Sequence, residues 1–253
     1  MSQTKKYLKL KEIKDEIGPL CAREKYNFTE APTVDIQGTL LHTSEFIPGR
    51  KNVFIDSPSK NGMTISVEQV ALNHYINVLG YTHGKHAETT TLTTLYAILF
   101  WEIIWTNSVY NVFVDTFQHA PLDLQTKDFY RNRKEIIDNR LKLFSSSSIE
   151  DICRMASDCW NSNYGYQCYG VNFELFESLE EFLSLLKCFR PQQLVNLCEY
   201  ISKNYRYCRS GGPDLVIWSD ETDMVKFVEV KGPGDHLSYK QMIWLDFMVK
   251  NSI

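Results

Sequence analysis

The stretch GGPDLVIWSDETDMVKFVEVK, residues 211–231, constrains the fold more than any other part of the chain. Its first apolar run, Asp214 to Trp218, is rich in β-branched residues, and its second run, Val225 to Lys231, alternates between polar and apolar residues. Ser219 to Met224 (SDETDM) lies between the two runs and has the composition of a turn. The stretch therefore predicts a β-hairpin.

The polar residues of this hairpin are expected to meet on one face. A period of two puts Glu229 and Lys231 on the same side of the second strand. If Trp218 pairs with Val225, Asp214 falls opposite Glu229, because paired positions in an antiparallel hairpin keep a constant sum. Directly opposed residues hold their Cβ atoms about 4.5–5.5 Å apart, and like charges there repel. Two carboxylates so close require a cation, and Lys231 flanks them.

The spacing of these residues matches the PD-(D/E)xK arrangement of restriction-type nucleases. Pro213-Asp214 is followed after fourteen residues by Glu229-Val230-Lys231. Carboxylates and a strand carbonyl, here that of Val230, suit a hard divalent cation such as Mg²⁺. A bound metal activates water for phosphodiester hydrolysis, and a lysine orients that water or stabilises developing charge. An exposed, ion-paired hairpin explains the same short pattern equally well.

Composition narrows the remaining classes of protein. With 253 residues and 43% hydrophobic residues the chain can bury a substantial core, and its net charge of −4 restricts any DNA-binding surface to a local patch. Seven cysteines without a CxxC pair or finger-like spacing predict reduced thiols and no zinc site. The N-terminus lacks an apolar signal core, and Leu95 to Trp105 is too short to span a membrane, so it predicts a buried core helix.

Periodicity and capping residues give the other elements. Val34 to Leu41 and Asn52 to Ile55 read as strands, and Ser66 with Gln69 opens a helix that ends before Gly80. Val109 to Leu124 is expected to hold a helix that finishes near Gln118 and His119, before Pro121. Further helices are expected at residues 129–144, 149–160, 175–189 and 192–206, and after a second capping pair, Ser238 and Gln241.

Two glutamates compete for a place beside the hairpin acids. Glu88 lies at or near the N-terminus of a helix, where the helix dipole favours a carboxylate. A plain capping acid explains Glu88 as well. Glu102, one turn before the end of the same helix, is expected to point to solvent or to pair locally.

Basic and amide side chains provide candidate DNA contacts. Arg50 and Lys51 occupy a loop tip, and residues 129–144 form the densest basic segment. An exposed turn and a solvated helix face explain these two features without DNA. The full set of DNA-binding candidates is Arg50, Lys51, Arg131, Arg133, Lys134, Arg206, Arg209 and Gln241.

Longer sequence blocks resemble the nuclease region of the Fanconi anaemia-associated nucleases, which carry a VRR-NUC domain. The hairpin blocks are GGPDLVIW and KFVEVKGPGDHLSYKQMIWL, and the upstream blocks are SVEQVALNHY, HAETTTLTTLYAILFWEII and QHAPLDL. They occur in the family's order and extend from about Val34 to the end of the chain. Five ordered blocks make the resemblance far more specific than the short motif.

The resemblance implies a set of site residues. Glu88, Asp214, Glu229 and the Val230 carbonyl are expected to hold Mg²⁺ or Mn²⁺. Lys231 is expected to be the catalytic lysine, and Gln118, also among the catalytic candidates, a polar group beside the metal. The helices between Glu88 and Asp214 are expected to bring Glu88 to the hairpin.

The resemblance also implies a phosphodiesterase that cuts 5′ flaps and branched DNA and acts as a 5′→3′ exonuclease in interstrand crosslink repair, in the nucleus. Recruitment to the Fanconi complex uses a domain that this chain is not expected to contain. The chain is expected to be a fragment that lacks a final strand. A Holliday-junction-type resolvase and a non-catalytic scaffold that binds branched DNA are the alternatives.

The expected fold class is α/β, with a restriction-endonuclease-like mixed sheet flanked by helices. The expected organisation is an N-terminal tail or short helix at residues 1–33, followed by a nuclease domain at residues 34–253. A helical insertion is expected at about residues 129–206.

Overall fold

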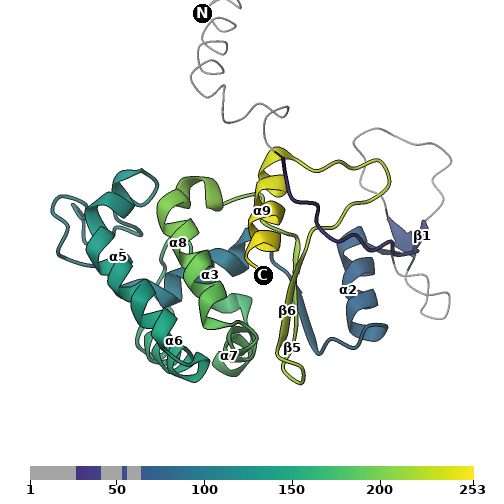
Figure 1. Cartoon of the computed structure of the whole chain (residues 1–253), viewed down its shortest axis with the longest axis horizontal. Coiled ribbons are helices and arrows are strands. Elements are labelled where there is room, and N and C mark those ends of the chain that lie inside the picture. The colour runs from purple at the N-terminus through teal and green to yellow at the C-terminus, as the bar shows by residue number, and fades with distance from the viewer. Residues whose placement is uncertain (1–26, 41–52, 56–63) are drawn as a thin grey trace, which may run out of the picture.

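The computed structural model describes residues 27–40, 53–55 and 64–253. Its architecture is mixed α/β: a small antiparallel sheet lies between a single helix on one side and a group of helices on the other (Figure 1). This confirms the predicted fold class. Most of residues 1–33, together with Cys21, Arg50 and Lys51, lie outside the described residues, and the predicted boundary near Val34 stays a prediction.

The sheet that contains the hairpin has the strand order β4-β5-β6, with β4 at His83–His86, β5 at Leu215–Ser219 and β6 at Met224–Val228. Every strand pair within the described residues is antiparallel. Trp218 pairs with Val225, so the register predicted for the hairpin is correct. The central strand, β5, is buried along its whole length because it has a neighbour on each edge and helices on each face.

The two faces of the sheet belong to two hydrophobic clusters. Val216 and Trp218 point into the main core, where the indole Nε1 of Trp218 donates to Ser184 Oγ at 2.9 Å. Leu215 and Ile217 point to the other side and pack under helix α2 (Val67–Asn77), which Ser66 caps as predicted. Alternation along the second strand also follows the prediction, since Val228 and Val230 join the cluster under α2.

Helix α3 (Thr89–Leu99) is the centre of the main core, and α4 (Trp101–Ile104) continues it. Every residue of α3 from Thr91 to Leu99 is buried. The apolar run around it is therefore the buried core helix that the sequence predicts. No helix among the described residues is both long and apolar enough to cross a membrane.

The remaining helices surround α3 on the side of the sheet away from α2 (Figure 1). Ser148, Ser178 and Ser238 cap three of them with side-chain hydrogen bonds. Their bounds are α5 Asp128–Ser146, α6 Ile149–Asn163, the 3-10 helix η1 Phe173–Leu175, α7 Leu179–Lys187, α8 Pro191–Cys208 and α9 Tyr239–Lys250. The six described cysteines are free thiols, as predicted.

The helix predicted to end near Gln118 is wrong, because residues 109–118 form turns and bends. Asn111 has a positive φ of 61°, which a helix does not accommodate, and the carboxylate of Asp115 accepts from the N–H of Phe117 at 2.9 Å. Short polar side chains that bond to nearby main chain favour turns over helix. The predicted strands near the N-terminus are also shorter than expected: β1 is Thr39–Leu40 and β2 is Phe54–Ile55, which pairs with β3, Thr64–Ile65.

Candidate active site

Strand β4 brings Glu88 next to Asp214. In the β4–β5 register His86 pairs with Leu215, and just beyond that pair the N–H groups of Ala87 and Glu88 both donate to the main-chain oxygen of Asp214, at 3.1 and 3.2 Å. The prediction that the intervening helices bring Glu88 to the hairpin is wrong, because β4, which was not predicted, does so. A four-residue strand containing glycine and two histidines has no clear periodic signal.

Glu88 has an unusual backbone conformation at this point. Its φ of 46° and ψ of −138° lie in a region that normally favours glycine, and Thr90 N–H donates to the Ala87 oxygen at 3.0 Å. These features are those of a type II′ turn with Glu88 at its first central position. Such a conformation costs about 1–3 kcal/mol and persists only where the surroundings impose it. Glu88 precedes helix α3 as predicted, but it makes no side-chain cap, so its carboxylate is free for another task.

The loop before Asp214 is held against the start of α3. Gly212 N–H donates to Thr89 Oγ1 at 3.0 Å, in a buried contact. A Cβ atom at position 212 would lie 3.2 Å from the Thr89 Cα, so a larger residue would require the start of α3 to shift by a few tenths of an ångström. The contact fixes the strand that carries Asp214 relative to the helix that follows Glu88.

A cluster of potential metal ligands results from these contacts. His86, Glu88 and Asp214 each offer one ligand atom, and these atoms all lie within 4.8 Å of one another. His86 is not among the site residues predicted from the sequence. The sequence feature that could have predicted it is its position two residues before Glu88, because residues so close in sequence lie near the same end of a strand.

Glu229 lies on the other side of Asp214. The strand ladder stops at the Leu215–Val228 pair, and Asp214 Oδ2 then accepts the N–H of Val230 at 2.8 Å, which keeps Glu229 opposite Asp214. Glu229 Oε1 accepts from Lys231 Nζ and from Gln241 Nε2, each at 2.5 Å. The side chain of Glu229 is only 3% exposed, whereas that of Lys231 is 29% exposed. The hairpin therefore assembles the acids and the lysine as predicted.

The second carboxylate oxygen of Glu229, Oε2, is left without a hydrogen-bond donor in the described part of the chain. Oε2 is buried and has no hydrogen-bond partner among the described residues. Burial raises the pKa of this carboxyl to about 7, the bond from Lys231 opposes the rise, and the negative charge of Asp214 adds to it. A buried carboxylate with a free oxygen, next to the carboxylate of Asp214, suits a divalent cation. The residues present therefore fit the metal that the sequence pattern implies.

Comparison with protein families then identifies the domain. Residues 145–253, which contain the hairpin, match the model of the VRR-NUC domain. Similarity to individual proteins extends further toward the N-terminus: Fanconi-associated nuclease 1 of Danio rerio is 36% identical over 236 residues, which cover 87% of this chain and 24% of the relative. The Homo sapiens protein of the same name is 34% identical over 236 residues, covering 90% of this chain and 23% of the relative.

The chain contains a VRR-NUC domain. The chain spans about a quarter of the length of these curated relatives. A crystal structure of paFAN1 bound to DNA with a 2-nt 5′ flap and a gap has the same fold, with a TM-score of 0.69 and 23% identity, over 96% of this chain and 39% of that chain. The corresponding complex with a 1-nt flap gives a TM-score of 0.68 and 24% identity over the same shares of the two chains.

Gln241 was predicted to contact DNA, and in this VRR-NUC domain its side chain instead bonds to other residues of the protein. Its Oε1 accepts the N–H of Ser238 at 2.8 Å, which completes a capping box at the start of α9, while its Nε2 donates to Glu229. One side chain thus joins the helix cap to the buried carboxylate.

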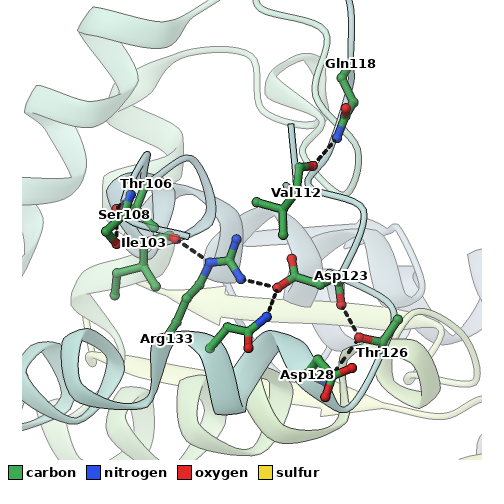
Figure 2. Close-up of polar contacts among 10 residues, drawn as sticks. Ile103, Thr106, Ser108, Val112, Gln118, Asp123, Thr126, Asp128 and Arg133 are labelled. Atoms are coloured by element: carbon green, nitrogen blue, oxygen red, sulfur yellow. Dashed lines mark hydrogen bonds and ion pairs between the residues drawn. The ribbon is translucent and has the colours of Figure 1, made fainter. Parts of the chain in front are cut away.

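Gln118 stabilises its own loop. Its Nε2 donates to the oxygens of Val112, at 2.7 Å, and Ala120, at 2.5 Å, and its Oε1 accepts the N–H of Val114 at 3.0 Å (Figure 2 shows the bond to Val112). A catalytic position for Gln118 beside the metal therefore stays a prediction. Glu102 has an exposed side chain, so the solvent-facing position expected for it is confirmed, and it pairs with Arg140 of α5 at 2.5 Å.

The DNA contact predicted for Arg133 is wrong, because its side chain is buried. Its side chain is fully buried and bonds to Asp123 Oδ2 at 2.6 Å and to the Ile103 oxygen at 3.0 Å (Figure 2). Position 133 lies on the inner face of α5, which the basic composition of the segment did not reveal. The other described basic candidates, Arg131, Lys134, Arg206 and Arg209, are exposed.

Proposed function

We propose that this chain is the catalytic part of a divalent-metal-dependent, structure-specific DNA nuclease that cuts 5′ flaps and degrades DNA in the 5′→3′ direction. The observation that carries the proposal is the meeting of Glu88 and Asp214 at adjacent strand ends, with the buried, partly unpaired carboxylate of Glu229 opposite. An ion pair that only stabilises the fold needs one acid and one base, and does not need three acids close together.

The carboxylates of Glu88, Asp214 and Glu229 would hold the cation, together with the main-chain carbonyl of Val230. Mg²⁺ and Mn²⁺ both suit oxygen ligands. A divalent cation bound there lowers the pKa of water and stabilises negative charge on the phosphate. Asp214 is positioned by its bond to the Val230 N–H, and Glu88 by its strained turn, so the carboxylates need little rearrangement on binding.

Lys231 is the group that would act on the reacting water or on the phosphate. Its ammonium bonds to Glu229 and remains partly exposed, so it can reach solvent without leaving the site. A positive charge fixed here orients a water molecule and stabilises the charge that develops on the phosphate oxygens. Gln241 holds the same carboxylate oxygen from the other side, which limits the movement of Glu229.

Branched DNA is the proposed substrate. The titles of the two similar crystal structures name 5′-flap DNA, and the curated relatives are named as Fanconi-associated nucleases. Arg131, Arg206 and Arg209 are exposed and supply local positive charge on a chain with a net charge of −4. By the same likeness, we propose a role in interstrand crosslink repair in the nucleus, with recruitment to a Fanconi complex through parts of a longer protein.

The proposal is tested by incubating the 253-residue chain with a 5′-flap substrate, a four-way junction and a plain duplex of matched sequence. Each substrate is run with Mg²⁺, with Mn²⁺ and with a chelator, for the wild type and for Asp214→Ala. We expect metal-dependent cleavage of the flap that Asp214→Ala abolishes while circular dichroism shows an intact fold.

Other results would contradict the proposal in distinct ways. Equal cleavage by the wild type and Asp214→Ala would identify a contaminating nuclease. Symmetrical cutting of the four-way junction in preference to the flap would identify a resolvase. Binding of branched DNA without cutting under all metal conditions would identify a scaffold.

A further inference from the structure

A histidine, His86, lies next to the acids of the candidate active site. His86 is the last residue of β4, and its imidazole offers a nitrogen within 4.8 Å of ligand atoms of Glu88 and Asp214. The register explains this closeness, because His86 pairs with Leu215, the residue that follows Asp214.

The imidazole of His86 is exposed, and no other described side chain holds it by a hydrogen bond or an ion pair. Other described histidines have structural partners. His83 stacks on Trp218 with ring centroids 5.0 Å apart, and His119 Nδ1 bonds to the oxygen of Gln167 at 2.8 Å. His86 is therefore free to turn toward a ligand at the acids.

The spacing suits coordination of a single ion. Two donors on opposite sides of an ion lie about 4.2 Å apart, since each metal–ligand distance is about 2.1 Å. Three ligands of one octahedral ion also include pairs at right angles, which lie about 3 Å apart, so a limit of 4.8 Å leaves up to about 2 Å of side-chain movement to bring all three atoms into contact with one cation. The buried Oε2 of Glu229 has no hydrogen-bond partner among the described residues, although Lys231 bonds to Oε1, and is an independent sign that one carboxylate oxygen at this end of the sheet is left for a cation.

We propose that His86 is a nitrogen ligand of the active-site cation and biases the site toward Mn²⁺ over Mg²⁺. Mg²⁺ and Ca²⁺ bind oxygen ligands, whereas Mn²⁺, which oxygen ligands also suit, is a first-row transition metal that accepts an imidazole nitrogen more readily than Mg²⁺ does. If only carboxylates held the cation, the size of the site and not the type of ligand would distinguish Mg²⁺ from Mn²⁺. One imidazole adds a preference that oxygen ligands do not supply. The proposal rests on the proposed function, because it assumes a divalent cation at these acids.

Mn²⁺ bound to the 253-residue chain, without DNA, provides the direct test. Pulsed electron paramagnetic resonance detects coupling between Mn²⁺ and a directly bound ¹⁴N nucleus. We expect this coupling in the wild type and its loss in His86→Ala. Titration of the free Mn²⁺ signal is expected to show affinity about ten-fold lower or more in the variant. Competition with Mg²⁺ is expected to show a much smaller change for Mg²⁺.

Two further variants control the test. His83→Ala removes an imidazole from the other end of the same strand, about 10 Å away at about 3.3 Å per residue, and should leave the coupling unchanged. His86→Asn keeps a polar side chain and offers an oxygen, so it should lose the coupling yet bind Mg²⁺ as the wild type does. This variant serves as the test if His86→Ala fails to fold.

The outcomes separate this inference from the proposed function. Retained ¹⁴N coupling in both His86 variants, or an unchanged ratio of Mn²⁺ to Mg²⁺ affinity, overturns the assignment of His86 alone. A wild-type chain that binds neither cation, or one that binds equally after Asp214→Ala, overturns the metal site itself.

Discussion

The main-chain N–H of Glu88 donates to the main-chain oxygen of Asp214 at 3.2 Å, although the two acids are 126 positions apart in the sequence. Their carboxylates are thus positioned by backbone hydrogen bonds at the ends of neighbouring strands. The main chains of the two acids cannot separate without breaking these bonds, so only side-chain rotation or a nearby cation relieves the repulsion between the carboxylates. Opposite charge must come to the acids, and Lys231 supplies only part of it.

The strained turn at Glu88 predicts a conflict between stability and activity. Glycine accepts a φ of 46°, whereas alanine does not, so Glu88→Gly is expected to be more stable than Glu88→Ala by about 1 kcal/mol or more. Both variants lack the carboxylate and are expected to lose flap cleavage. Chemical denaturation and cleavage assays on the pair test this. Equal stability of the two variants would show that the turn is relaxed in solution.

Lys231 is expected to matter for chemistry and not for metal binding. Lys231→Met removes the ammonium beside Glu229 and should lower the rate of flap cleavage about 100-fold or more, since one fixed charge is lost from the transition state. Mn²⁺ affinity should not fall, because the ammonium is not a ligand. The matched control is Lys226→Met on β6, whose ammonium lies over the rings of Tyr75 and Tyr81 on the opposite face. A comparable loss of cleavage in Lys226→Met would refute the assignment.

Gln241 links a helix cap to the active site, so its loss should affect both. Gln241→Met removes the acceptor for the Ser238 N–H and the donor to Glu229, and we expect a loss of about 1 kcal/mol in the free energy of unfolding together with slower cleavage. Gln69→Met at the corresponding position of α2 is the control, because Gln69 bonds to Asn73 and not to an active-site acid. Identical cleavage by the two variants would mean that Gln241 acts only as a cap.

Arg133 is expected to stabilise the fold without contacting DNA. Arg133→Met leaves the buried carboxylate of Asp123 unpaired and should lower the free energy of unfolding by about 3–5 kcal/mol. Replacing both residues, as Arg133→Met with Asp123→Leu, should recover part of this loss. Arg131→Met, on the exposed face of the same helix, should leave stability nearly unchanged and weaken DNA binding instead. A stable Arg133→Met variant with weakened DNA binding would reverse our interpretation.

The local features of this protein were predictable because they depend on residues close in the sequence. A period of two and a polar turn determine the register of the hairpin and the face that Glu229 and Lys231 share. Ser66 and Ser238 start their helices as their sequences indicate, and the most apolar run is the buried helix α3. These follow from alternation, capping and hydrophobicity, which need no knowledge of distant partners.

Other features depend on contacts that only the tertiary structure creates. The pairing of β4 with β5, which adds His86 to the acids, joins segments about half the chain apart, and β4 has too few residues for a pattern. The burial of Arg133 depends on Asp123 lying above the inner face of α5, and the position of Gln241 depends on how α9 meets the hairpin. The sequence by itself determined which residues could carry the chemistry. The fold decided which of them meet, because pairing and burial are properties of the assembled chain.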